Sequence, residues 1–211
     1  MLKQIVTSIA ALAIAGTVVA GTPFWDNDIN ANSFSGRALS PPVFPNIRVV
    51  DNFSSDVDTN IGRMDAAIIE DAAWVSSGEM EVYVYNNNNG VPSTLFTSGT
   101  GPVTRTFTGE QRFGRDLYIY SVTGLNISVP AGSYWIGLRD PNGSGSGTNY
   151  WMTSSGGGDT TTGFSSTDGG TTWVPEGDNW HHAFELYKIP APGALALLGL
   201  GGLVARRRRR A

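Results

Sequence analysis

Apolar and polar residues alternate with a period of two along the middle of the chain, which is typical of half-buried β-strands. The clearest example is the stretch 79–85, where Met80, Val82 and Val84 share one face. Two glutamates and two tyrosines occupy the other face, which we expect to be solvated. The Asn-Gly pair at 89–90 supplies the positive φ angles of a tight turn. The pattern therefore predicts a strand followed by a hairpin.

Further strands are predicted by the same criterion between residues 47 and 188. The alternation is clear at 117–122 and 133–139, and weaker at 61–69, 74–75, 104–107, 149–153 and 183–187. No window has a sustained helical period. The sequence thus predicts an all-β domain over 47–188, an antiparallel jelly-roll-like β-sandwich, with a barrel as the competing architecture. Residues 142–172, rich in Gly and Ser, are expected to form long mobile loops on one rim.

The N-terminus has the pattern of an export signal. Lys3 gives a positive start, residues 5–19 are apolar, and Ala20 ends a small-residue cleavage site, so residues 1–20 are expected to be a signal peptide read by the Sec export machinery. Residues 21–46 are rich in Pro, Asn and Ser. They predict an extended N-terminal arm with one edge strand.

The C-terminal stretch 189–211 has three parts. A Pro190-Ala191-Pro192 mark precedes an apolar run over 193–205. As a helix this run spans about 20 Å, against about 30 Å of hydrocarbon, so we expect a short transmembrane helix. The positive-inside rule keeps the basic cluster that follows in the cytoplasm and places the preceding domain outside. This cluster consists of Arg206, Arg207, Arg208, Arg209 and Arg210.

This order of Pro-x-Pro mark, apolar helix and arginine cluster resembles the PEP-CTERM sorting signal of exopolysaccharide-producing Gram-negative bacteria, with Ala191 where the family usually has Glu. The resemblance implies transient inner-membrane anchoring, cleavage near Pro190 by an exosortase-type transpeptidase, and release to the cell surface or extracellular matrix. It also implies association with exopolysaccharide or biofilm. Asp51-Asn52-Phe53 and the segment 131–138 look like parts of the β-sandwich ectodomain common in such proteins.

The net charge limits the kinds of partner the domain can bind, and the cysteine content limits how it can be stabilised. Residues 21–189 hold eight Arg and Lys and all 18 Asp and Glu, a formal net charge of −10. Such an acidic domain disfavours nucleic acid and anionic membrane as partners. The chain has no cysteine, so packing and not disulfides must stabilise the exported domain.

One stretch has spaced oxygen ligands. Asp56, Asp58 and Asn60 alternate like the start of a calcium loop, but Ile61 and Ala67 stand where an EF-hand has Gly and its final carboxylate. The sequence therefore predicts no metal or other cofactor, with calcium at these three residues as the alternative, and a polar lead-in to the next strand as the simpler interpretation.

No catalytic constellation stands out, so we expect a protein without enzymatic activity. The two histidines, His181 and His182, are adjacent and would face opposite sides of a strand. No nucleophile-elbow pattern occurs. Glu79 and Glu81 share a strand face as paired carboxylates of a glycosidase would, which leaves a secreted hydrolase as the least favoured alternative.

Residues 166–173 match the Asp-box pattern Ser-x-Asp-x-Gly-x-Thr-Trp. The pattern predicts a hairpin, because Asp168 can accept hydrogen bonds from amides of the turn while Trp173 packs beneath it. It resembles the repeated Asp-boxes of sialidase-type propellers, which are structural and imply no catalysis.

Aromatic residues provide the alternative function. Trp135, Trp151 and Trp180 are candidates for a platform that stacks on sugar rings, as in carbohydrate-binding modules, although most such aromatics are core residues. The sequence therefore favours a non-catalytic exported surface or matrix protein, with a polysaccharide-binding ectodomain as the alternative.

Overall fold

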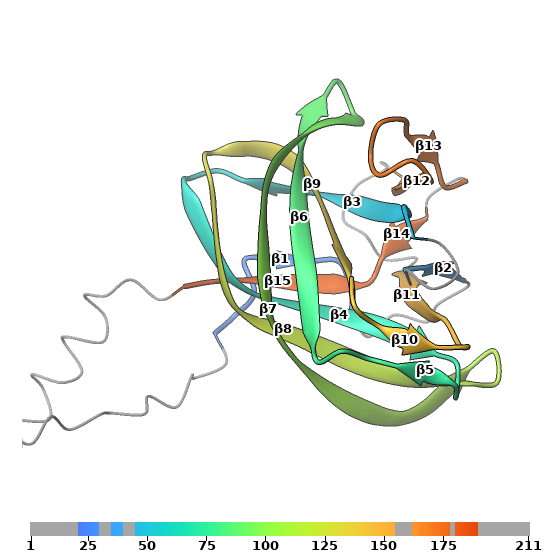
Figure 1. Ribbon diagram of the computed structural model, residues 1–211. Coiled ribbons are helices and arrows are strands. Elements are labelled where there is room, and N and C mark those ends of the chain that lie inside the picture. Colours follow the sequence, from blue (N-terminus) through green and yellow to red (C-terminus); the bar gives the residue numbers. More distant parts are fainter. Residues whose placement is uncertain (1–20, 30–34, 40–44, 155–161, 178–179, 190–211) are drawn as a thin grey trace, which may run out of the picture.

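The computed structural model describes residues 21–29, 35–39, 45–154, 162–177 and 180–189 (Figure 1). These residues contain strands and no helix, and the strands pair antiparallel throughout. The prediction of an antiparallel all-β domain is confirmed. The strands are β1 (Trp25–Asp26), β2 (Gly36–Ala38), β3 (Arg48–Ser55), β4 (Thr59–Glu70), β5 (Trp74–Val75), β6 (Glu79–Asn88), β7 (Val91–Arg112), β8 (Arg115–Val129), β9 (Gly132–Arg139), β10 (Ser144–Gly145), β11 (Asn149–Ser154), β12 (Phe164–Ser166), β13 (Val174–Pro175), β14 (His181–His182) and β15 (Phe184–Lys188).

The main sheet curls because one long strand is shared between its two halves. Residues 91–102 of β7 pair with β6, and residues 103–112 of the same strand pair with β8. The order of strands is β1-β15-β4-β8-β7-β6-β9-β3-β12-β13, with β11, β2 and β14 attached beside β4. Figure 1 shows how this path brings β3, β9 and β6 over β4, β8 and β15.

The main core fills the space between the two halves. It takes its side chains from both: Phe53, Val82 and Ile136 from β3, β6 and β9, and Met64, Val122 and Phe184 from β4, β8 and β15. All six are fully buried. Since no disulfide is available, this packing supplies the stability of the domain.

Strand β6 is buried on both faces. Met80, Val82 and Val84 lie in the main core, as predicted. The prediction that the opposite face is solvated is wrong for Tyr83 and Tyr85, which are also buried. They belong to a second cluster on the outer face of the sheet, which we call the outer cluster: Val50, Tyr83, Tyr85, Trp135 and Phe164, with Trp173 packed against it.

A glycine in β9 makes room for Tyr83. Gly137 pairs with Tyr83 across the sheet, and a Cβ at this position would lie 2.0 Å from the carbonyl oxygen of Val49. The Tyr83 hydroxyl accepts a hydrogen bond from the Val49 amide at 3.2 Å. Strand β9 thus approaches β6 closely enough for this buried tyrosine to reach β3.

The region 142–172 is more ordered than its composition predicts. Strands β11 and β12 lie within it, and both are buried because β11 pairs with β4 and β12 pairs with β3. Strand β11 confirms the strand predicted at 149–153, whereas the expectation of a long mobile loop is wrong for β12, and residues 155–161 lie outside the described part of the chain. The N-terminal arm contributes two short strands, where one was predicted: β1 beside β15 and β2 beside β11.

The predicted signal peptide (1–20) and the sorting segment after Ile189 lie outside the described residues, so the short C-terminal helix is not tested. Within the described ranges, no helix has the length and apolar character to cross a membrane.

We expect Tyr83→Phe to lower the free energy of unfolding by about 1–3 kcal/mol, because the buried Val49 amide loses this acceptor. Urea unfolding followed by fluorescence measures the effect. Tyr118→Phe, at a half-exposed tyrosine of β8, is the matched control, with an expected change within about 0.5 kcal/mol. Equal effects of the two substitutions would contradict the assigned role of the Tyr83 hydroxyl.

Candidate functional site

The Asp-box forms the hairpin that the sequence predicts, between β12 and β13, which we call the Asp-box hairpin (residues 164–175). Its Asp168 carboxylate accepts hydrogen bonds from the amides of Thr171 and Thr172 at 3.0 and 2.9 Å. The hydroxyls of Thr172 and Ser166 donate to it at 2.7 Å each. One carboxylate therefore organises the whole turn.

These donors also fix the charge of the turn. The backbone amide and the hydroxyl of Thr172, together with the Ser166 hydroxyl, hold the pKa of Asp168 well below its ordinary value of 3.8. Hydrogen bonds to the ionised form stabilise that form. Asp168 is thus a structural carboxylate whose acceptor positions face the turn.

The Asp-box hairpin lies against the outer cluster. Gly170 has a φ of 95°, and a Cβ there would lie 2.4 Å from the Tyr85 hydroxyl, so glycine is required both for the turn and for the contact. Trp173 meets Tyr85 edge-on, with ring centroids 4.9 Å apart. The hairpin thereby covers the outer face of β6.

A buried carboxylate ties the base of the Asp-box hairpin to the sheet. Glu176, directly after β13, receives a hydrogen bond from Nε2 of His182 at 3.1 Å and lies 2.5 Å from Nε of Arg37. Its own amide donates to the carbonyl of Gly163 at 2.9 Å. Burial alone raises the pKa of Glu176, but the His182 hydrogen bond and the nearby Arg37 charge outweigh burial and lower it.

A second buried carboxylate joins the two halves of the sheet. Asp51 of β3 accepts hydrogen bonds from the Asn27 side chain at 2.9 Å and from the backbone amide of His182. Nδ1 of His181 lies 3.6 Å from the other Asp51 oxygen. The adjacent histidines thus face different carboxylates, and the His182 ring stacks on Trp151 with a centroid distance of 4.6 Å. This network is a buried support for the outer cluster.

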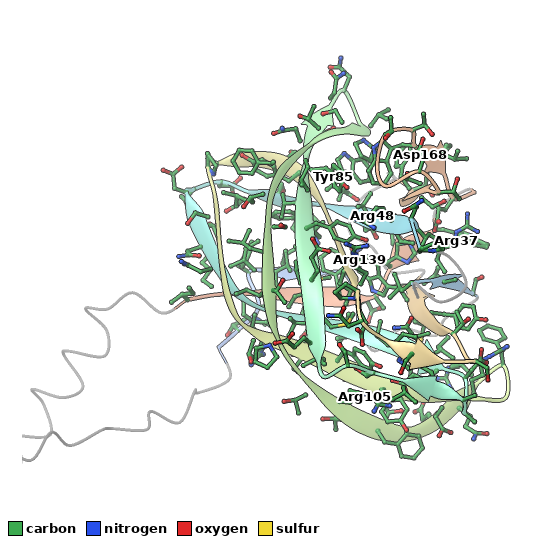
Figure 2. The ribbon with its side chains drawn as sticks, in the orientation of Figure 1. Arg37, Arg48, Tyr85, Arg105, Arg139 and Asp168 are labelled. Atoms are coloured by element: carbon green, nitrogen blue, oxygen red, sulfur yellow. The ribbon has the colours of Figure 1, made fainter. Side chains whose placement is uncertain are left out.

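An open groove of about 560 Å³ lies between the β6–β7 hairpin and the Asp-box hairpin. Its volume falls within the range of about 300–1,000 Å³ that is usual for small-ligand sites. Figure 2 shows Arg48 and Tyr85 beside β6, with Asp168 on the hairpin across from them. The groove is lined by Arg48, Glu81, Tyr83, Tyr85, Pro92, Ser93, Thr94, Leu95, Gly169, Gly170, Thr171 and Trp173.

The groove combines aromatic rings, hydroxyls and charges. Glu81 is paired with Arg139 at 2.6 Å. Arg48 donates to its neighbouring carbonyl, Ile47 O, at 3.0 Å and lies 5.3 Å from the centre of the Tyr83 ring. The rings of Tyr83 and Tyr85 are buried, so the half-buried Trp173 is the aromatic side chain that can contact a ligand, beside hydroxyl and charged groups that can hydrogen-bond to it. They form the chemistry of a binding surface.

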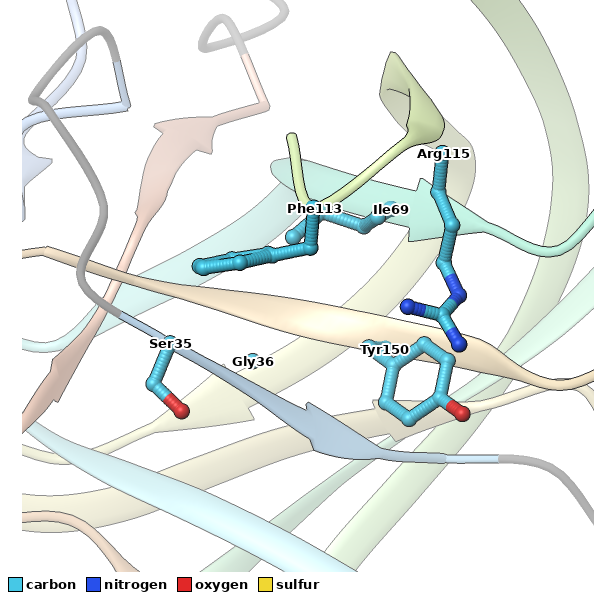
Figure 3. Close-up of a pocket in the computed structure, with 6 residues that line it drawn as sticks. All are labelled: Ser35, Gly36, Ile69, Phe113, Arg115 and Tyr150. Carbon is cyan, nitrogen blue, oxygen red and sulfur yellow. The ribbon is translucent and has the colours of Figure 1, made fainter. Parts of the chain in front are cut away.

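A smaller pocket of about 310 Å³ lies beside the β7–β8 turn (Figure 3). Arg115 extends over the ring of Tyr150, 5.2 Å from its centre, and is paired with Asp71. Phe113 lies on the other side of this pocket. Because the charge of Arg115 is already neutralised, this pocket offers fewer groups to a ligand than the groove does.

The predicted aromatic platform is wrong for two of its three members. Trp135 and Trp151 are both 0% exposed, so neither presents a ring to solvent. Trp135 packs edge-on against Phe164 in the outer cluster, and Trp151 lies in the main core. Trp180 is half-buried and accepts a hydrogen bond from Gly163 through its carbonyl, outside the groove.

The remaining predicted site residues lie elsewhere. Asp58 accepts a hydrogen bond from the Ala131 amide at 3.1 Å, and Asn60 donates to Asn126 at 2.8 Å. Across the described ranges no three His, Asp or Glu side chains gather as a metal site. Pro190 to Pro192 and Arg206 to Arg210 lie outside the described residues.

Sequence reasoning missed the groove. It named the Asp-box and the alternation of β6 separately, but not Arg48 or the contact of Trp173 with Tyr85. The only local sequence signal for the groove was the Asp-box. It places a tryptophan at the end of a hairpin but does not show which residue that tryptophan packs against.

Comparison with models of known protein families, with curated protein sequences and with solved structures finds no match to this chain.

Asp168→Asn is expected to weaken the Asp-box hairpin at neutral pH. Because the folded-state pKa is depressed, the contribution of Asp168 is fully present above its unfolded pKa of 3.8 and is lost progressively as the pH falls from there toward the lower folded-state pKa. Amide hydrogen exchange of Thr171 and Thr172 should therefore differ between wild type and variant at pH 7. When the free energy of unfolding is measured for both proteins, the difference between them should be smaller at low pH than at pH 7. A pH-independent difference would contradict this role.

Glu176→Gln should lower the free energy of unfolding by about 2–3 kcal/mol, because the buried carboxylate loses its charged hydrogen bond with His182 and its ion pair with Arg37. Glu110→Gln is the matched control, since Glu110 is exposed and pairs with Arg112 on the surface. Surface pairs contribute at most about 1 kcal/mol. Urea denaturation of both variants measures the difference, and similar small losses would show that Glu176 does not hold the hairpin.

Proposed function

We propose that this chain is a non-catalytic exported protein of the cell surface or extracellular matrix. Its signal peptide is removed after Ala20, and its C-terminal segment anchors it transiently in the inner membrane. An exosortase-type transpeptidase then cleaves near Pro190 and releases the β-domain. The supporting sequence features are the apolar stretches at both ends and the arginine cluster 206–210.

The observation that best supports this proposal is the position of the two ends of the domain. Gly21 and Ile189, the first and last described residues, line the same pocket. Both ends are held in the sheet: the Phe24 amide donates to Leu186, and the Ile189 amide donates to Asn60, at 2.9 Å each. In Figure 1 the Asp-box hairpin lies away from this end. Cutting both signals therefore leaves the folded domain and its groove intact.

The arrangement of the strands within the all-β domain is a further part of this proposal. We infer a jelly-roll-like sandwich, supported by one core enclosed between two halves of a curled antiparallel sheet. Before processing, a short membrane helix over 193–205 follows this domain.

A second candidate function is polysaccharide binding. The observation that favours it is the open groove with the half-buried Trp173 in its wall, in place of the platform built on Trp135 and Trp151. The two functions are compatible, since a matrix protein can hold a glycan through such a groove.

Mass spectrometry of the protein from the envelope and the culture medium tests the export proposal. We expect a mature chain that starts at Gly21 and ends near Pro190–Pro192, without the arginine cluster. Replacing Arg206 to Arg210 by Gln should leave the unprocessed chain in the membrane fraction or misoriented. A released wild-type chain that keeps all five arginines would contradict the proposal.

A further inference from the structure

Arg48 carries a positive charge that no carboxylate neutralises among the described residues. The other described arginines, at positions 37, 63, 105, 112, 115 and 139, each pair with Asp or Glu. The carboxylates nearest to the groove are occupied: Glu81 pairs with Arg139, and Asp168 accepts from its own turn. The described partners of the Arg48 guanidinium are uncharged groups, the Ile47 carbonyl at 3.0 Å and the Tyr85 side chain, so its positive charge can attract an anionic ligand.

The groove around Arg48 is built for a ligand with hydroxyls and a flat apolar side. Trp173 is half-buried, so part of its indole ring is accessible from the groove. Ser93, Thr94 and Thr171 add hydroxyl groups on both sides. Hydroxyls can donate and accept at once, so their local bonds leave capacity for a sugar.

The groove walls are held before any ligand arrives. The Asp168 carboxylate fixes the Asp-box hairpin, and Glu176 fixes its base. On the opposite side Asn86 bonds to Thr94 at 2.9 Å, which ties β6 to β7. Such preorganisation reduces the entropy that binding must overcome.

The negative net charge of the domain disfavours ligands with a high density of negative charge. Residues 21–189 carry a formal net charge of −10, which repels densely charged polyanions. A single local cation suits a polymer whose carboxylates are widely spaced. Arginine binds a carboxylate through two parallel N–H donors, which gives it both strength and orientation.

We propose that the groove binds a saccharide chain with spaced uronic-acid carboxylates, one carboxylate against Arg48 and a sugar ring against Trp173. This proposal rests on the second candidate function and names its ligand class. Binding is non-covalent. Arg48 gives the groove its preference for acidic over neutral sugars.

The test uses a hyaluronan hexasaccharide, which has one carboxylate in each disaccharide, and the same hexasaccharide with its carboxyl groups reduced to alcohols. Calorimetry with the chain after removal of both signals measures both affinities. We expect wild type to prefer the acidic sugar by roughly tenfold or more, since one charged hydrogen-bonding contact contributes that much. Arg48→Gln should abolish the preference and keep the affinity for the neutral sugar, while Trp173→Ala should weaken both.

Arg112→Gln is the matched control, because it removes an equal charge from the β7–β8 turn, outside the groove. Retained binding of the neutral sugar by Arg48→Gln shows that this variant is folded. Absence of binding by wild type, or an acidic preference that survives Arg48→Gln, would overturn the proposal. Neither result affects the export proposal, which is read from the termini of the mature chain.

Discussion

Strand β6 is buried on both faces, and this burial determines how the surrounding segments pack. One face enters the main core through Met80, Val82 and Val84. The other carries Tyr83 and Tyr85, which must be covered by residues from distant parts of the chain. The Asp-box hairpin provides this cover, and the groove exists because the cover stops short of the β6–β7 hairpin.

Two buried carboxylates hold that cover in place. Glu176 connects the Asp-box hairpin to β2 and β14, and Asp51 connects β3 to the amides of the N-terminal arm and β14. Buried charges are costly unless they are paired or hydrogen-bonded, and both of these are. In a chain without cysteine, such polar links complement the packing of the core.

The sequence predicted those structural features that depend on a few neighbouring residues. The alternation of β6 predicted its core face, and the Asp-box predicted a hairpin, because period and turn chemistry act over a few residues. The sequence could not show that Tyr85 is covered by Gly169, 84 positions later, or that Trp135 and Trp151 are enclosed. Burial of a strand face depends on which distant segment packs on it, and that is a tertiary property.

In our proposal, the groove beside the Asp-box hairpin is the ligand-binding surface of the domain. Chemical-shift mapping of the isotope-labelled mature chain, titrated with an acidic hexasaccharide, tests it most directly. The largest shifts are expected on the backbone of four residues that line the groove: Arg48, Tyr85, Thr171 and Trp173. Shifts confined to the pocket of Phe113 and Tyr150, or no saturable shifts at all, would contradict it.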